Sequence, residues 1–243
     1  MVGPSKDRLG HSKIILIQEN RCRVKLLNLE FCSRSDLRYR EIRDRHYIPN
    51  RGAHAQQLHF IVHDGSKVAG IISAGSSVYS VKSRNDFFSI PGEREVRQSL
   101  YLPAIVNNTV CRLENSRKNL GTETLALWRK VTAELWLDIY GVPVIGFETF
   151  IIEESWRRGS MYLADNWTHV GTTAGSTKAH NGLTNKSSRL KVEQQMVFCR
   201  WAKKPVVPKD AYVSSWRAST PEEKTDARAK ANKRKELLGV RFD

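Results

Sequence analysis

Three successive segments in the middle of this chain constrain its fold most. Apolar strands are predicted at 104–113 and 142–152, and an amphipathic helix with a 3.6-residue period lies between them at 120–140. Gly141 is placed to end that helix. A helix entered through Asn119-Leu120-Gly121-Thr122 presents unpaired N–H groups and a positive dipole end to whatever lies before it. This segment is therefore predicted to seat a phosphate.

The chain is strongly basic. Its formal net charge is +15 over 243 residues, and its isoelectric point is about 9.9. Such an excess favours a polyanionic partner, namely DNA, RNA or an anionic membrane surface. The alternative is a surface charge that only keeps the protein soluble. A nucleic acid is thus one expected partner, and the phosphate seat adds the prospect of chemistry performed on it.

Composition predicts a folded protein of the cytoplasm. Hydrophobic residues make up 40% of the chain, which is enough for a core. No apolar run approaches the roughly 20 residues that span a bilayer, so no membrane is expected as a partner. The four cysteines lack CxxC spacing, which disfavours a zinc ribbon or a disulfide framework and points to a reducing cytosol.

Shorter patterns place the remaining elements. Asp64-Gly65 predicts a hairpin, and Thr220-Pro221 predicts the start of a polar helix. Further predictions are helices at 35–45, 92–100 and 153–158, a strand at 194–201, a loop or edge strand at 76–84 and a basic surface loop at 177–189. The chain therefore divides into a domain at 1–208 and a basic helical tail at 209–243.

Several blocks of residues resemble one superfamily. They are His46-Tyr47, the run 105–109 leading into 119–121, and 148–150 together with 159–167 and 171–173. The superfamily contains the phage Mom DNA-modification proteins and the DruA-type proteins of the Druantia defence system. The resemblance covers about residues 40–200, and its most specific part is the tyrosine and Asn-Trp pair before a Gly-x-Thr turn.

The resemblance implies a GNAT-like α/β fold, with a mixed, mostly antiparallel sheet flanked by helices. For the Mom branch it implies use of acetyl-CoA and conversion of adenine in DNA to an acetamido (carbamoylmethyl) adenine, which protects phage DNA from restriction. For some members it also implies iron, whose ligands here would be His46 and Glu148. The Druantia branch carries no chemistry that we can assign.

The coenzyme would be bound at the loop before the long helix. Lys118, Asn119, Gly121 and Thr122 are expected to seat its phosphates, with Arg112 as a ligand or an electrostatic neighbour. The loop departs from the usual GNAT pattern because it holds one glycine rather than two or three.

Four residues are candidates for catalysis. His46 and the adjacent Tyr47 follow an arginine-rich segment, and a histidine there is either a base or ligand or an exposed loop residue. Glu148 interrupts an apolar strand, so it is either a site residue or the partner of an arginine such as Arg112. Tyr162 is expected to protonate the departing thiolate, the alternative being a core aromatic.

Further residues are candidates for DNA binding. Asn107 and Asn108 could read adenine or form a β-bulge, and Trp167, next to Asn166, could stack on a flipped base or close the core. Phosphate contacts are expected from the basic loop, through Lys178, Lys186 and Arg189.

Three functions remain open from the sequence. The first is an enzyme that modifies adenine flipped out of double-stranded DNA, with a homodimer left open. The second is a DNA-binding defence component with a degenerate GNAT core and no catalysis. The third is an ordinary protein or small-molecule acetyltransferase, for which DNA binding should be weak and insensitive to salt.

Overall fold

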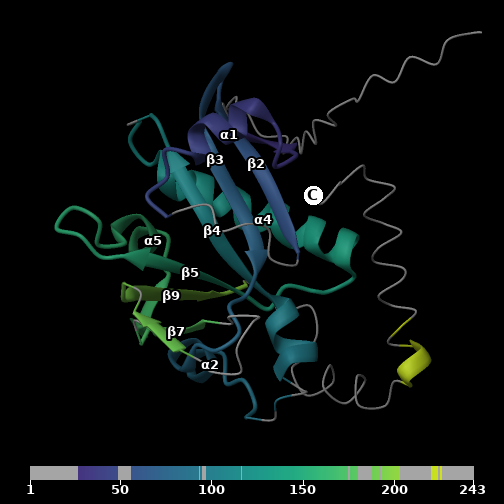
Figure 1. The fold of residues 1–243 in the computed structure, drawn as a ribbon. Helices are drawn as coiled ribbons and strands as arrows, with labels where there is room; N and C mark the ends of the chain where they lie inside the picture. Colours follow the sequence, from purple (N-terminus) through teal and green to yellow (C-terminus); the bar gives the residue numbers. More distant parts are fainter. Residues whose placement is uncertain are drawn as a thin grey trace, which may run out of the picture.

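A seven-stranded sheet forms the centre of the protein (Figure 1). The computed structural model describes residues 27–48, 56–92, 94, 97–115, 117–174, 176–179, 188–191, 193–202, 220–223 and 225. The strand order is β1-β2-β3-β4-β5-β9-β6, and all neighbours in this sheet pair antiparallel except β4 and β5. The predicted mixed, mostly antiparallel sheet flanked by helices is confirmed. The strands are β1 (Leu27–Cys32), β2 (Gln57–Asp64), β3 (Lys67–Ser76), β4 (Ile105–Leu113), β5 (Gly146–Ile152), β6 (Thr168–Thr172), β7 (Ser176–Ala179), β8 (Ser188–Lys191) and β9 (Gln195–Trp201).

Helices cover both faces of this sheet (Figure 1). The long α4 (Leu120–Tyr140) packs Trp128 and Trp136 into the largest apolar cluster, which also contains Tyr162 of α5 (Ser160–Ala164). On the other face, α1 (Leu37–Arg43) packs against β2, β3 and β4, and α2 (Lys82–Phe87) lies beside β9 and β6. Since alternate strand residues point to opposite faces, neighbouring residues of β4 and β5 belong to different clusters.

The sequence between β4 and β5 folds as predicted. Asn119 adopts the left-handed conformation, with φ 63°, immediately before α4, and Gly141 adopts it with φ 70° immediately after. Gly141 donates its N–H to the Leu137 carbonyl, which satisfies one of the carbonyls that a helix end leaves without a partner. Asparagine is among the few non-glycine residues that tolerate this conformation, so both ends of α4 are encoded locally.

The parallel pair is short. β4 and β5 pair from Ile105 with Gly146 to Asn108 with Thr149, while β4 continues to Leu113 and β5 to Ile152. No ladder bonds join the two strands beyond Asn108 and Thr149. Side chains bond part of the backbone there, since Asn108 Nδ2 donates to the Val110 carbonyl at 3.3 Å and Arg157 donates to the Ile152 carbonyl at 3.4 Å.

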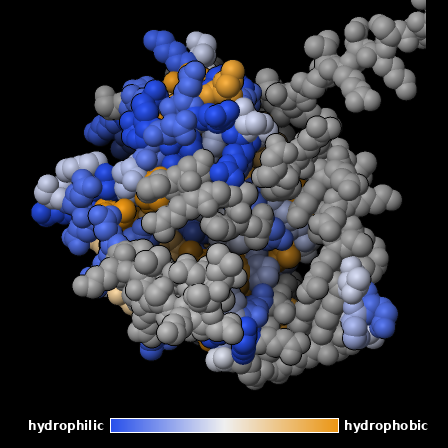
Figure 2. Space-filling view, viewed as in Figure 1, coloured by the Kyte–Doolittle hydropathy of each residue, from blue (hydrophilic) through white to orange (hydrophobic). Residues whose placement is uncertain are grey.

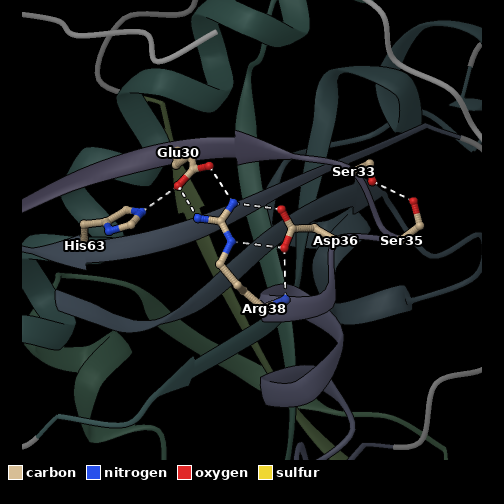
Figure 3. A network of polar contacts seen from close by, with 6 residues as sticks. All are labelled: Glu30, Ser33, Ser35, Asp36, Arg38 and His63. Carbon is tan, nitrogen blue, oxygen red and sulfur yellow. Dashed lines mark hydrogen bonds and ion pairs between the residues drawn. The ribbon is translucent and has the colours of Figure 1, made fainter. Parts of the chain in front are cut away.

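An ionic network holds α1 against the edge of the sheet (Figure 3). Arg38 donates to both carboxylate oxygens of Glu30 on β1, at 3.0 and 2.7 Å, and also to Asp36. Asp36 caps α1 by accepting from the Arg38 N–H, and His63 of β2 lies 2.7 Å from Glu30. The hydrogen bonds from Arg38 lower the pKa of Glu30, so the carboxylate stays charged at neutral pH.

Several predicted elements differ from those in the structure. No helix forms at 153–158, because Glu154 and Arg157 pair through their backbones and Gly159 then turns left-handed, with φ 73°. The loop predicted at 177–189 contains the antiparallel pair β7–β8, and the segment 92–100 ends in a π-helical turn, Arg97–Tyr101, followed by a 3-10 turn, Leu102–Ala104. The sequence did not predict α2, α5 or β6.

Of the tail at 209–243, the structure describes residues 220–223 and 225. Thr220 accepts a hydrogen bond from the Glu223 N–H at 3.2 Å and donates its own N–H to the Glu223 carboxylate at 2.7 Å. This reciprocal capping box confirms the predicted helix start. On the face of the molecule in Figure 2, hydrophilic residues cover most of the coloured surface. Among the described residues, no helix is long and apolar enough to span a membrane.

Gly70 brings β3 close to β4. A Cβ on Gly70 would lie 2.2 Å from the carbonyl oxygen of Arg112, which is backbone of the neighbouring strand. We expect Gly70→Ala to lower the free energy of unfolding by about 1–3 kcal/mol, because the sheet must open to admit the methyl group. Equilibrium urea unfolding measures this, with Gly92→Ala as control, since a Cβ there meets nothing within 4 Å. Equal losses in the two variants would contradict the prediction.

Candidate active site

Tyr162 and Asn108 meet where the pairing of β4 with β5 ends. The buried Tyr162 hydroxyl donates to Asn108 Oδ1 at 2.7 Å. Asn108 is held in turn, because its Nδ2 donates to the Ser73 carbonyl at 3.0 Å, and its backbone carbonyl accepts from Thr149 Oγ1 at 3.0 Å. Burial raises the pKa of Tyr162 well above its ordinary value, so the hydroxyl keeps its proton and has a fixed acceptor.

Local geometry explains how Tyr162 reaches this place. Gly159 precedes α5 in the left-handed conformation, and a Cβ there would lie 2.4 Å from the Phe198 ring. Glycine therefore allows α5 to start directly on β9. Tyr162 then packs between Phe198, at 6.0 Å between ring centroids, and Trp167, at 5.2 Å.

Glu148 lies on the other face of the sheet. Phe147 belongs to the apolar cluster that contains Tyr162, and the next residue of a strand points to the opposite face. There Glu148 accepts from Arg84 Nη1 at 2.6 Å and from the Val78 N–H at 2.8 Å, with both ionic side chains fully buried. Burial raises the pKa of Glu148 to about 7, although Arg84 opposes this shift. The structure therefore separates Glu148 from Tyr162.

The arginine paired with Glu148 differs from the one the sequence suggested. Arg112 donates to Glu114 at 2.6 Å and to the Arg45 carbonyl at 2.6 Å, on a partly exposed part of β4. The alternative of a buried salt bridge for Glu148 is confirmed, but through Arg84 of α2. Arg84 was missed because nothing in its own surroundings in the sequence indicates burial.

His46 and Tyr47 lie together beside Arg157. Their rings stack at 4.5 Å, and the His46 Nδ1 accepts from the Ile48 N–H at 3.2 Å. Burial, reinforced by Arg43, lowers the pKa of His46 to about 4, so the imidazole is neutral at pH 7. Besides burial, Cys111, which is half-buried, and Tyr47 also raise the pKa of Tyr162.

The buried neutral His46 predicts a loss of stability in acid. The unfolded chain takes up a proton near pH 6.5 and the folded one only near 4, so this contribution is complete above 6.5 and is lost as the pH falls towards 4. The shift corresponds to about 3 kcal/mol. Urea unfolding of the parent and of His46→Gln at several pH values measures this loss. We expect the free energy of unfolding of the variant to fall less between pH 6.5 and 4. Parallel pH profiles would contradict the prediction.

The predicted coenzyme residues surround the start of α4. Lys118 and Asn119 are exposed, and Thr122 Oγ1 donates to the Asn119 carbonyl at 3.0 Å. A Cβ on Gly121 would lie 2.5 Å from the sulfur of Met161 in α5, so the glycine leaves room for the Met161 side chain between the two helices. Of the first-turn N–H groups, that of Leu120 donates to the Arg117 carbonyl at 3.1 Å, and Met161 covers part of this end. Only part of the helix start therefore suits a diphosphate.

An iron site is not supported by the residues present. Among the described residues, no group of three His, Cys, Asp or Glu side chains lies close enough to hold a metal ion. The two predicted ligands also have different neighbours, since His46 contacts Tyr47 and Ile48, whereas Glu148 contacts Arg84 and Val78. This donor set does not fit iron, and no step below depends on it.

The structure buries some of the residues predicted to bind DNA and leaves others exposed. The register shift opposite Ser73 confirms the β-bulge alternative for the Asn107–Thr109 segment, in which Asn107 Oδ1 is buried without a partner. Trp167 is buried and donates to Asp165 at 2.9 Å, which confirms the core alternative, whereas Asn166 is exposed. Lys178 and Arg189 occupy paired backbone positions of β7 and β8, and Lys186 lies outside the described residues.

The sequence comparison identifies the family. A family model described as "Druantia protein DruA" matches residues 10–200, which is most of the chain. The chain belongs to the DruA family. The predicted resemblance to DruA-type proteins is therefore confirmed for this protein, whereas modification of the Mom type stays a prediction. No curated protein matches the DruA-family chain.

Solved structures similar to this DruA-family protein include acetyltransferases. Arabidopsis thaliana NAA60 in complex with acetyl-CoA has 14% identity and a TM-score of 0.46, over 73% of this chain and 99% of that one. A Bacillus subtilis acetyltransferase in complex with CoA has 9% identity and a TM-score of 0.43, over 72% and 99%. The ribosomal L7/L12 acetyltransferase RimL has 9% identity and a TM-score of 0.35, over 60% of this chain and 69% of that one.

Proposed function

We propose that this DruA-family protein is an acetyl-CoA-dependent enzyme that modifies the exocyclic amine of adenine in DNA. The observation that carries the proposal is the buried Tyr162 hydroxyl, fixed on Asn108 at the point where β4 and β5 stop pairing. A proton donor held there stands beside two strands that no longer pair with each other. The +15 charge of the chain supports a nucleic acid as the acceptor substrate.

The coenzyme would be bound by backbone groups. The first turn of α4, at Gly121 and Thr122, would hold its diphosphate, with Lys118 and Asn119 beside it. The facing edges of β4 and β5 would hold its extended arm through their N–H and C=O groups. When bound, acetyl-CoA supplies an acetyl group activated as a thioester.

Tyr162 acts as the general acid in this proposal. The adenine amine attacks the acetyl carbon, so that a C–N bond forms as the C–S bond breaks. Tyr162 gives its phenolic proton to the departing thiolate, and the proton released by the amine returns to the phenolate. Asn108 orients the hydroxyl, and the neutral His46 and Tyr47 form the neighbouring wall. Glu148 has no part in the chemistry, because its carboxylate is held by Arg84 on the opposite face of the sheet.

Simple acetyl transfer balances with acetyl-CoA alone. The carbamoylmethyl product that the resemblance to Mom implies requires a nitrogen donor and an oxidant in addition. The mass of the modified nucleoside therefore distinguishes the two products.

The test is to express the protein with plasmid DNA in cells and to analyse the digested nucleosides by mass spectrometry. A modified adenosine that depends on the protein is expected, and a known active homologue serves as control. Only unmodified adenosines, with the control active, would overturn the proposal. Calorimetry with acetyl-CoA tests the coenzyme separately.

A second candidate is a DNA-binding defence component without catalysis. It is favoured by Met161, whose side chain lies against Gly121 where the coenzyme diphosphate would dock. It predicts DNA binding with a steep salt dependence but no heat of binding with acetyl-CoA.

A further inference from the structure

A row of stacked side chains leads from the candidate site to the surface. The rings of His46 and Tyr47 stack at 4.5 Å, and the guanidinium carbon of Arg157 lies 3.4 Å from the centre of the Tyr47 ring. The same carbon lies 4.2 Å from the Trp156 ring. Trp156 is 72% exposed, although a large aromatic side chain normally gains from burial.

The segment that presents Trp156 is held in place. The backbones of Glu154 and Arg157 exchange two hydrogen bonds, at 3.3 and 2.9 Å. Arg157 also donates to the Glu154 carboxylate at 3.1 Å and to the Ile152 carbonyl at 3.4 Å, and only 13% of its side chain is exposed. The indole is therefore supported by an ordered arginine, so binding a flat ligand there orders little that is not already ordered.

Strand β5 links this row to the proposed acid. Arg157 donates to the carbonyl of Ile152 at the end of β5. Thr149 of the same strand donates to the carbonyl of Asn108, which holds Tyr162. Thr149 and Ile152 are three residues apart, about 10 Å along a strand. A nucleotide chain with one base at the candidate site would therefore have bases further along the chain near the exposed end of the row.

We propose that Trp156, supported by Arg157 and Tyr47, is the platform on which an unpaired base of DNA stacks. This inference rests on the proposed function, because an enzyme acting on a flipped adenine must hold an opened strand. An exposed indole face accepts any base. The exposed Glu153 and Glu154 lie on one side of Trp156 in the sequence, whereas the exposed Arg158 on the other side and the +15 charge of the chain suit the phosphates. This charge favours a nucleic acid over a protein partner.

The test compares two strands that carry the same phosphates. The full-length protein is titrated with a fluorescent single-stranded oligonucleotide and with an abasic strand of equal length. Trp156→Ala is expected to weaken binding of the base-bearing strand by about 5- to 100-fold, while binding of the abasic strand stays within about 2-fold. The dependence of affinity on salt should be unchanged, because no phosphate contact is lost.

Two further variants make the result specific. Leu37→Ala removes an apolar side chain that is 70% exposed on α1, and it should bind both strands as the parent does. Trp156→Phe keeps an aromatic face and should restore most of the affinity. Equal weakening for both strands, or no weakening, overturns the inference. A Trp156→Ala variant that binds both strands normally but loses self-association in sedimentation also overturns it, in favour of a protein contact.

This test is independent of the chemistry. If adenosine is modified but Trp156→Ala binds the base-bearing strand as the parent does, only the stacking platform is wrong. If the base-bearing strand depends on Trp156 but no modified nucleoside appears, the platform stands and the enzymatic proposal fails.

Discussion

Replacing Tyr162 with phenylalanine is expected to lower the rate of DNA modification by about 10²–10⁴-fold, the range typical for loss of a general acid. The phenyl ring keeps its place between Phe198 and Trp167, so only the proton donor is lost. The measurement is single-turnover formation of the modified nucleoside at saturating acetyl-CoA. Because the hydroxyl does not hold the coenzyme in this proposal, the affinity measured by calorimetry should change little.

Tyr39→Phe is the matched control for Tyr162→Phe. Tyr39 is also a buried tyrosine with a hydrogen bond, since its hydroxyl lies 2.8 Å from Ser73 Oγ on the face of the sheet that α1 covers. Each substitution removes one buried hydrogen bond. Tyr162→Phe leaves Asn108 Oδ1 without its donor, at a cost of about 1–3 kcal/mol in stability, whereas after Tyr39→Phe the Ser73 Oγ keeps its contact with His59 Nδ1 at 3.1 Å. A general acid is supported only if Tyr162→Phe loses far more activity than Tyr39→Phe. Similar losses would assign the effect to stability.

Replacing Arg84 with methionine should destabilise the protein by about 3–5 kcal/mol. The change leaves the Glu148 carboxylate fully buried without its counter-ion, and an uncompensated buried charge is among the costliest single defects. It also frees the Val78 carbonyl, which accepts from Arg84 Nη2 at 2.6 Å. Equilibrium urea unfolding at pH 8, where Glu148 is ionised, measures the loss. A variant as stable as the parent would contradict a buried ion pair at this position.

The double variant Arg84→Met/Glu148→Leu distinguishes two quantities. One is the destabilisation caused by an unpaired Glu148 carboxylate, and the other is the net contribution of the ion pair to stability. Apolar side chains of similar volume often replace a buried ion pair without loss, so the double variant should recover most of the stability. The recovery is reduced by about 1–3 kcal/mol, because the Val78 N–H and carbonyl both lose partners. If its activity per folded molecule equals that of the parent, Glu148 has a structural role only.

The sequence predicted the elements whose signals are local. The 3.6-residue period and Gly141 indicated α4, and Asp64-Gly65 indicated the β2–β3 hairpin. Elements with weak local signals were missed or wrong. The six-residue α2 has no side-chain cap, and the segment at 153–158 has a helix-like composition but is held in a reversal by the backbone pairing of Glu154 with Arg157.

The candidate site could not be predicted in the same way, because its contacts are not local. Its decisive contacts join residues far apart in the chain, since Arg84 and Glu148 are 64 positions apart and Asn108 and Tyr162 are 54 apart. Periodicity can indicate that Glu148 needs a partner, because a buried charge is costly, but it does not identify the arginine that pairs with it. For the same reason the sequence suggested Trp167 for base stacking, whereas burial assigns it to the core and leaves Trp156 exposed.

The sequence by itself determined the order of strands and helices around the start of α4, the basic character of the chain and the family resemblance. These properties follow from spacing, charge and short-range backbone preferences, which every segment carries within itself. Only the tertiary structure decided which face of the sheet each polar side chain occupies, and so which of them meet. That choice depends on strand register and on packing between distant segments, where a shift of one residue would exchange the two faces.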